Sequence, residues 1–240
     1  MKKNNFPFRL HACLSECDSV LQNEDEMSLA FLHGQWPHSY SISERVCPRF
    51  RGWVARLLIH LLRVVIDLFS VRKSCAGFAE KSPSADVLIF SGTFNQYNAL
   101  RPSAIEISSA LPETIFLHTG QILNETDYPA NSARVRISFY MTLVSFVLSA
   151  RRFNKLWNKL KSVDMRLISW RLDIFLDSHR WLVYAWVTLT QLNPKFLIVS
   201  NDHNTQNRCL IAMAHNLGVR TIYLQHASVS NIFPALRFDF

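Results

Sequence analysis

The stretch from Pro194 to Phe240, PKFLIVSNDHNTQNRCLIAMAHNLGVRTIYLQHASVSNIFPALRFDF, decides the fold that the sequence predicts. It holds two short apolar runs, residues 196–200 and 219–224, and each stops at a polar segment, as buried strands do. Between them, apolar residues recur at i, i+3, i+4 and i+7 and so form one face of a helix: Leu210, Met213, Ala214 and Leu217. Gly218 stands where a glycine commonly ends a helix. Two strands joined by one helix predict a βαβ unit with parallel strands.

The polar segments that follow the two strands form the candidate site. They are Asn201-Asp202-His203-Asn204 and Gln225-His226-Ala227-Ser228. Ligands of open α/β sheets bind just beyond the carboxyl ends of the strands, so we expect both segments to lie at one functional edge. For Asp202, a helix cap and a ligand contact are both open. His226 is either functional or a residue that caps a helix or satisfies buried backbone groups.

A second βαβ unit is predicted earlier in the chain. Residues 86–90, DVLIF, have the composition of a strand and end at the polar turn 91–96, SGTFNQ. This turn matches neither a GxGxxG nor a Walker pattern. Pro102 is expected to open a short helix that runs to about Ala110, because proline suits a first helical position. Residues 114–118 are expected to form the next strand.

Three long apolar segments predict helices at residues 53–70, 137–161 and 172–192. The first is either a core helix, which we favour, or a helix in a membrane interface. Within residues 151–161 one face is apolar and the other basic, which is typical of a helix on an anionic membrane, of a helix packed on a domain edge, or of a solvated basic face. The expected membrane contacts are Arg151, Arg152, Lys155, Trp157 and Lys159.

The predicted fold class is therefore α/β, a Rossmann-like three-layer domain with a parallel sheet. We expect this domain to span residues 51–240, with a helical insertion at about 137–190. Residues 1–50 are expected to be a poorly defined N-terminal segment. In that segment His11, Cys13 and Cys17 match no zinc pattern, and we expect them to be ordinary surface or half-buried residues.

Composition narrows the setting and the partners. The chain has 240 residues and a formal net charge of +8, so an anionic partner is expected. No run is long enough to cross a bilayer, and the N-terminus lacks the apolar segment of a signal peptide. Five scattered cysteines fit a reducing compartment. These features favour a cytoplasmic protein, with peripheral binding to the inner face of the membrane as an extension, and no motif favours nucleic-acid binding.

The segments FLIVSNDHNTQNRCLIAMAHNLGVRTIYLQHASV and FPALRFDF resemble the N-terminal domain of GT-B glycosyltransferase-like proteins from bacterial surface-polysaccharide clusters. They are similar, more distantly, to the CDP-glycerol glycerophosphotransferase superfamily. DVLIFSGTFNQYNALRPSAIEIS also looks like the first strand, acceptor-side loop and following helix of such proteins. The resemblance covers residues 84–118 and 190–240. It departs from the family at Ala227, where glycine often follows the histidine.

The resemblance implies a role for each matched residue. Family members transfer a sugar or a glycerol phosphate from a nucleotide-activated donor to an acceptor hydroxyl. His226 is the implied catalytic base or phosphate contact, because imidazole titrates near neutrality. The implied substrate-binding residues are Thr93, Asn95, Asn201, Asp202, His203, Gln225 and Ser228. No cofactor or metal is implied.

A GT-B enzyme also needs a second Rossmann-like domain for the donor nucleotide, and the sequence ends where this family enters the interdomain region. We therefore expect the N-terminal half of a GT-B fold without its C-terminal donor-binding domain, truncated and inactive alone. Its expected function is the acceptor side of a transferase in capsule, O-antigen or teichoic-acid-like synthesis. The expected partners are a nucleotide-activated sugar or glycerol donor, a glycan or lipid-linked acceptor and an anionic membrane surface. The alternative is a non-catalytic membrane-surface binding module or remnant.

Overall fold

The computed structural model describes residues 6–23, 58, 62, 65, 84–119, 129, 131–135, 137–160, 165–200 and 204–224. For residues 6–9, 153–160 and 165–175 it describes the backbone alone. Of the helix expected at residues 53–70, Leu58, Leu62 and Val65 are described, and each is helical and exposed. The rest of that segment lies outside the described residues.

Five parallel strands form a single sheet in the order β3-β2-β1-β4-β5. Their bounds are β1 Val87–Ser91, β2 Thr114–His118, β3 Ser132–Arg134, β4 Phe196–Val199 and β5 Arg220–Tyr223. The four strands expected from apolar runs are confirmed to within one residue at each end. The short strand β3 was not expected, because Ser132-Ala133-Arg134 carries no apolar run.

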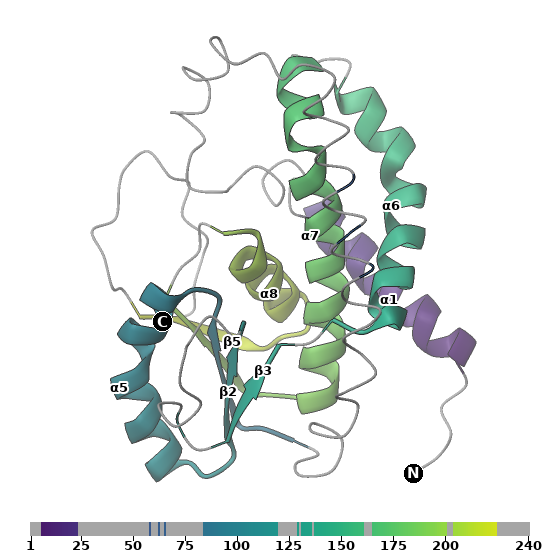
Figure 1. The fold of residues 1–240 in the computed structure, drawn as a ribbon. Coiled ribbons are helices and arrows are strands. Elements are labelled where there is room, and N and C mark those ends of the chain that lie inside the picture. The colour runs from purple at the N-terminus through teal and green to yellow at the C-terminus, as the bar shows by residue number, and fades with distance from the viewer. Residues whose placement is uncertain are drawn as a thin grey trace.

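Alternate side chains of β1 enter two separate cores. Val87 and Ile89 pack with the helix α5, Phe94–Ala110, whereas Leu88 and Phe90 pack on the opposite face. A strand covered on both faces must be apolar at every position, which is why β1 lacks the alternation of a half-exposed strand. The predicted three-layer α/β fold is therefore confirmed (Figure 1).

Helix α5 begins eight residues before the expected position. Thr93 is its N-cap and accepts a hydrogen bond from the backbone N–H of Gln96 at 3.3 Å. Pro102 lies inside the helix and is exposed. A proline on the solvent side is tolerated because the carbonyl that loses its N–H partner can bind water instead. The prediction that Pro102 opens the helix was therefore wrong.

The opposite face of the sheet carries a thicker layer of helices: α1 Phe6–Asn23, α6 Phe139–Leu160, α7 Met165–Leu192 and α8 Thr205–Asn216. In the chain, α6 and α7 come after β3 and before β4, at the position of the expected insertion. The two helices run side by side, as Figure 1 shows. Residues 181–185 of α7 are all buried, because this helix lies between the sheet, α6, α8 and α1. Gly218 ends α8 with φ of 73°, as expected.

Helix α1 shows that the N-terminal segment belongs to the domain. Cys13, Cys17 and Val20 are buried in the core, in contrast to the surface or half-buried positions expected for the two cysteines. The hydroxyl of Ser19 donates to the side-chain oxygen of Asn216 on α8 at 2.9 Å. The apolar residues of α1 are interrupted by polar ones that bind other helices, and this mixture concealed its buried face.

A carboxylate on α1 also holds helix α6. Asp18 binds the guanidinium groups of Arg151 at 3.1 Å and Arg152 at 3.0 Å, and its carbonyl accepts a further bond from Arg152. Arg152 is buried, so its positive charge needs the Asp18 carboxylate to compensate for the loss of solvent. The pair therefore fixes α1 against α6.

We predict that Asp18→Asn lowers the free energy of unfolding by about 2–3 kcal/mol, because it leaves a buried guanidinium without its carboxylate. This is less than for a fully buried pair, since Asp18 keeps some contact with solvent. The matched control is Asp86→Asn, whose partner Lys195 is exposed and 2.7 Å away, and which should change stability little. Urea unfolding of both variants tests this, and equal effects would contradict the structural role of Asp18.

Candidate functional site

The candidate site lies where the direction of the chain through the sheet reverses. From β1 the chain moves to β2 and β3 on one side, and it returns to β4 and β5 on the other. Helix α5 follows β1 on one face of the sheet and α8 follows β4 on the opposite face. In open sheets whose chain direction reverses in this way, ligands commonly bind at the carboxyl ends of the two strands beside the reversal, here β1 and β4, and we call this edge the candidate crevice.

Polar side chains converge on Gly92, which directly follows β1. The backbone N–H of Gly92 donates to Oε1 of Gln96 at 2.7 Å, and Thr119 Oγ1 donates to the Gly92 carbonyl at 2.9 Å. A Cβ atom on Gly92 would lie 2.6 Å from Gln206 Oε1 and 3.4 Å from Asn207 Oδ1. Glycine thus allows the first turn of α8 to approach the loop after β1.

A row of polar side chains crosses three neighbouring strands beside this junction. Ser91 pairs with His118 in the register of β1 and β2, and Ser200 follows β4 on the other side of β1. Ile89, Phe116 and Ile198 point toward α5. Ser91, His118 and Ser200 each follow one of them by two positions, so their side chains lie on the same face of the sheet. We call Ser91, His118 and Ser200 the polar row. All three side chains are buried.

The hydrogen bonds within the polar row are incomplete. The hydroxyl of Ser91 donates to the Thr93 carbonyl at 3.0 Å. The hydroxyl of Ser200 is buried and has no hydrogen-bond partner among the residues that the structure describes. An unsatisfied buried hydroxyl costs free energy, so such a group in a crevice is a candidate ligand contact.

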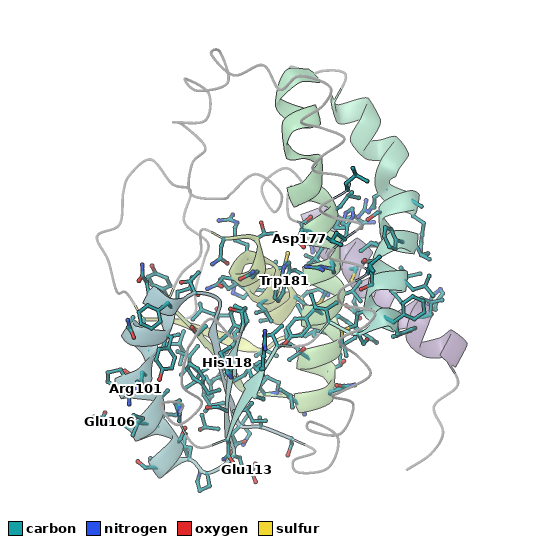
Figure 2. The ribbon with its side chains drawn as sticks, viewed as in Figure 1. Arg101, Glu106, Glu113, His118, Asp177 and Trp181 are labelled. Carbon is teal, nitrogen blue, oxygen red and sulfur yellow. The ribbon has the colours of Figure 1, made fainter. Side chains whose placement is uncertain are left out.

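His118 contributes an uncharged imidazole to the row. Burial, and then the positive charge of Arg134, lower its pKa from 6.5 to about 4. Its ring stacks on Phe116 with centroids 6.5 Å apart. Figure 2 shows His118 on the sheet, with Arg101 on α5 and Trp181 on α7. A neutral imidazole offers one donor and one acceptor, which suits a hydroxyl group better than an ion.

The first turn of α8 forms the other wall of the crevice. Asn204 is its N-cap, and its side chain accepts from the backbone N–H of Asn207 at 2.8 Å. The buried hydroxyl of Thr205 has no partner within the described part of the chain. Arg208 is also buried in this turn. Polar groups that can bind a ligand therefore approach the crevice from both walls.

Of the residues to which the resemblance gives a catalytic or substrate-binding role, the structure describes two. Thr93 caps α5 and Asn95 is exposed in its first turn, so both lie next to Gly92. The others lie outside the described residues: Asn201, Asp202, His203, Gln225, His226 and Ser228. Ser200 directly precedes this set, and Leu224, which donates its N–H to the Val199 carbonyl at 2.9 Å, directly precedes Gln225. The expectations for these six residues stay predictions.

Sequence reasoning missed the polar row and the residues around Gly92. The sequence prediction places Ser91 in the turn after the first strand, and His118 and Ser200 at the ends of theirs. The sequence does contain a signal for these residues. In a strand, a residue faces the same side of the sheet as the residue two positions before it, so a polar residue two positions after a core residue is expected to face that core. Gln96 and Asn207 gave no such signal, since an amide in the first turn of a helix is usually exposed.

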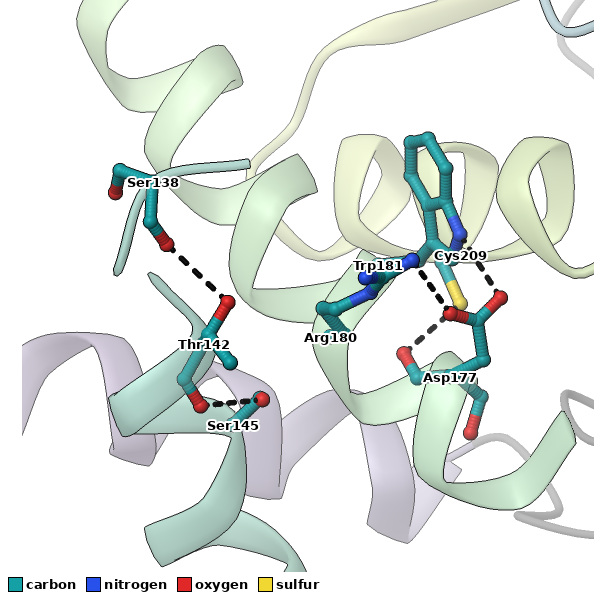
Figure 3. A network of polar contacts seen from close by, with 8 residues as sticks. Ser138, Thr142, Ser145, Asp177, Arg180, Trp181 and Cys209 are labelled. Carbon is teal, nitrogen blue, oxygen red and sulfur yellow. Dashed lines mark hydrogen bonds and ion pairs between the residues drawn. The ribbon is translucent and has the colours of Figure 1, made fainter. Parts of the chain in front are cut away.

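A second group of buried polar side chains lies between α6, α7 and α1. The hydroxyl of Ser149 is 2.7 Å from Nδ1 of His179. Asp177 binds Arg180 at 2.9 Å and the indole N–H of Trp181 at 3.2 Å, as Figure 3 shows. The contact between Ser149 and His179 joins α6 to α7, whereas the two contacts of Asp177 lie within α7. The group lies on the face of the sheet opposite α5. It is a packing feature of the helical layer.

This group gives Arg152 a role different from the expected membrane contact. Arg152 is buried against Asp18, so the guanidinium serves the joint between α1 and α6. Arg151 binds the same carboxylate but keeps an exposed side chain. Lys155, Trp157 and Lys159 lie in α6, and their side chains are outside the described set.

Three free cysteines pack in the same layer. Cys13, Cys17 and Cys209 are buried, and a hydrogen bond from Cys13, together with burial, raises the pKa of the Cys17 thiol well above its ordinary value. This raised pKa keeps the Cys17 thiol protonated and unreactive. Within the described residues, no group of three or more His, Cys, Asp and Glu side chains is placed to hold a metal ion.

Comparison with protein-family models, with curated protein sequences and with solved structures finds no match for this chain. The class of protein is therefore defined by the fold and the site: a Rossmann-like α/β domain with a polar, mostly uncharged crevice at the carboxyl ends of β1, β2 and β4. None of its described helices is long and apolar enough to cross a membrane.

We predict that Ser200→Ala leaves the free energy of unfolding unchanged or raises it by up to about 1 kcal/mol, because it removes a buried hydroxyl without a partner. Ser149→Ala is the matched control. It removes the partner of buried His179 and should cost about 1–3 kcal/mol. Urea unfolding compares the two, and a loss of stability in Ser200→Ala would show that its hydroxyl supports the fold.

We also predict that the protein loses stability as the pH falls from about 6.5 toward 3, since burial, followed by the charge of Arg152, lowers the pKa of His179 from 6.5 to about 3. The unfolded chain takes up this proton below its ordinary pKa, while the folded protein excludes it, so acid favours unfolding. The slope from this residue is at most about 1.4 kcal/mol per pH unit. The lowered pKa of His118 also makes the protein less stable as the pH falls from about 6.5 to about 4.

His179→Gln should reduce this slope, because the amide can still bind Ser149 but takes no proton. The control is His11→Gln, at an exposed position on α1. The measurement is the urea midpoint at several pH values above 4.5. An unchanged slope in His179→Gln would contradict the role of this histidine.

Proposed function

We propose that this chain is the acceptor-side domain of a GT-B-type glycosyltransferase or glycerophosphotransferase. The resemblance of residues 84–118 and 190–240 suggests this function, and the crevice between β1 and β4 supports it. The observation that carries the proposal is the buried, unpartnered hydroxyl of Ser200, in one row with Ser91 and the neutral imidazole of His118. This set of uncharged donors and acceptors fits the hydroxyl groups of a glycan or glycerol polymer.

The proposed reaction needs a base beside the acceptor hydroxyl. His226 is that base in the proposal, since it follows β5 in sequence and the parallel strands end at a common edge. Its imidazole accepts the hydroxyl proton while the acceptor oxygen bonds to the sugar carbon or the phosphorus of the donor. The nucleotide then leaves with the electrons of the broken bond. Thr93, Asn95 and Gln225 would position the acceptor around this centre.

The nucleotide-activated donor would bind to a second Rossmann-like domain, as the resemblance implies. That arrangement leaves this domain to bind and orient the acceptor. The proposed setting is the synthesis of a bacterial surface polymer at the inner face of the membrane. Such polymers grow on lipid-linked acceptors, so peripheral membrane binding is part of the proposal.

We predict that the chain binds hydroxyl-rich acceptors and that Ser200→Ala weakens this binding roughly three- to tenfold, the value of one hydrogen bond. The probes are soluble oligosaccharides and glycerol phosphate oligomers, and saturation-transfer NMR measures their dissociation constants. Ser149→Ala, which changes the helical layer alone, should bind with the wild-type affinity. A Ser200→Ala variant that binds like the wild type would remove the polar row from the site.

The catalytic role of His226 has a separate readout. When the donor-binding domain is supplied, His226→Ala should abolish transfer and leave acceptor binding intact. Transfer at the wild-type rate would exclude His226 as the base.

A further inference from the structure

The amphipathic pattern of α6 is reversed relative to that of an ordinary surface helix. Between Phe139 and Arg152, the residues that face solvent are mostly large and apolar, with exposed fractions of 51% for Phe139, 46% for Leu143, and 38% for both Phe146 and Val147. The buried residues of the same segment are mostly polar: Thr142, Ser145, Ser149 and Arg152, beside Val144 and Leu148. A helix in water normally buries its apolar side. The exposed side of α6 is therefore suited to a nonaqueous neighbour.

The reversed orientation is fixed by specific polar contacts. Ser149 binds His179 of α7, and Arg152 binds Asp18 of α1. Within α6, the hydroxyl of Ser145 donates to the Thr142 carbonyl at 2.7 Å (Figure 3). Rotating α6 to bury its phenylalanines would break the contacts with α7 and α1. The four exposed residues Phe139, Leu143, Phe146 and Val147 are therefore a built surface, which we call the apolar stripe.

The chain around the apolar stripe is strongly basic. Residues 128–163 contain no Asp or Glu, and their basic residues are Arg134, Arg136, Arg151, Arg152, Lys155, Lys159 and Lys161. Asp18 neutralises one charge of the Arg151–Arg152 pair, so this pair keeps a net positive charge. Apolar side chains next to an excess of basic residues are the combination with which interfacial helices bind anionic lipid.

A second exposed stripe has the same character. Leu58, Leu62 and Val65 are helical, exposed and spaced at i, i+4 and i+7. Seven basic residues fall between positions 45 and 73 around them: Arg45, Arg49, Arg51, Arg56, Arg63, Arg72 and Lys73. Two stripes that combine apolar side chains with basic flanks point to one kind of neighbour.

We propose that α6 lies flat on an anionic lipid bilayer and inserts the apolar stripe into the boundary between headgroups and acyl chains. The exposed guanidinium of Arg151, beside the stripe, then lies among the lipid phosphates, whereas Arg152 stays buried against Asp18. The charge of the chain favours lipid over a second copy, because two copies with a net charge of +8 each would bring two basic faces together. This surface belongs to the helical layer, and the inference does not depend on the crevice or on the acceptor.

Flotation with lipid vesicles tests the proposal. The full chain should float with vesicles of equal parts phosphatidylglycerol and phosphatidylcholine, and far less with phosphatidylcholine alone. Phe139→Gln/Phe146→Gln should weaken partitioning by about tenfold or more, since two phenyl rings no longer enter the apolar boundary. Leu143→Gln/Val147→Gln gives an independent second variant. All four positions are exposed, so the variants should keep the wild-type circular dichroism and unfolding midpoint.

The matched control is Phe94→Gln/Ile105→Gln, which removes two equally exposed apolar side chains from α5 on the far face of the sheet. This variant should float like the wild type. A wild-type chain that fails to float, or apolar-stripe variants that float as well as the control, would overturn the proposal. A wild-type dimer that becomes monomeric in the stripe variants, seen by light scattering without lipid, would show instead that this face joins two copies.

Discussion

The structure depends on the burial of strand β1, whose apolar side chains must be covered on both faces of the sheet. Its residues alternate between a core formed with α5 and a larger core formed with α1, α6, α7 and α8. Because β1 lies at the centre of the sheet, its neighbours β2 and β4 share both cores. The connection that leaves β1 through α5 runs to β2 on one face of the sheet, and the connection that leaves β4 through α8 runs to β5 on the opposite face. The polar row closes the α5 core at the carboxyl ends of these strands.

The strands were predictable because a strand that is buried on both faces has a continuous apolar run. Such a run can be recognised in the sequence without knowing which elements pack against it. The helices were less predictable. The start of α5 depends on the Thr93 cap, whereas Pro102 gave a misleading signal. Helix α6 was expected to contact a membrane through Arg151 and Arg152, but Arg152 is buried against Asp18. The buried partner of a charged residue can lie anywhere in the chain, and the sequence does not identify it.

The rule for parallel strands places the candidate site at the carboxyl edge of the sheet, and the structure describes buried polar groups at that edge. Its described polar groups differ in identity from the predicted ones. Thr93 and Asn95 lie beside Gly92, but the buried groups of the polar row come from the strand ends themselves. Recognising them requires the register between β1, β2 and β4. That register is set by packing of the whole sheet, which local spacing does not reveal.

Contacts between α1 and α8 join segments of the chain that are made at widely separated times. Ser19 binds Asn216, which is separated from it by 197 positions in the chain. During synthesis, α1 emerges first but has to wait roughly 10–40 s for this partner at ordinary translation rates. Over that interval the apolar and thiol groups of Cys13 and Cys17 have no α8 to cover them. Helix α1 is therefore made well before α8, and the face that it buries against α8 stays uncovered by that helix until the last described βαβ unit has been synthesised.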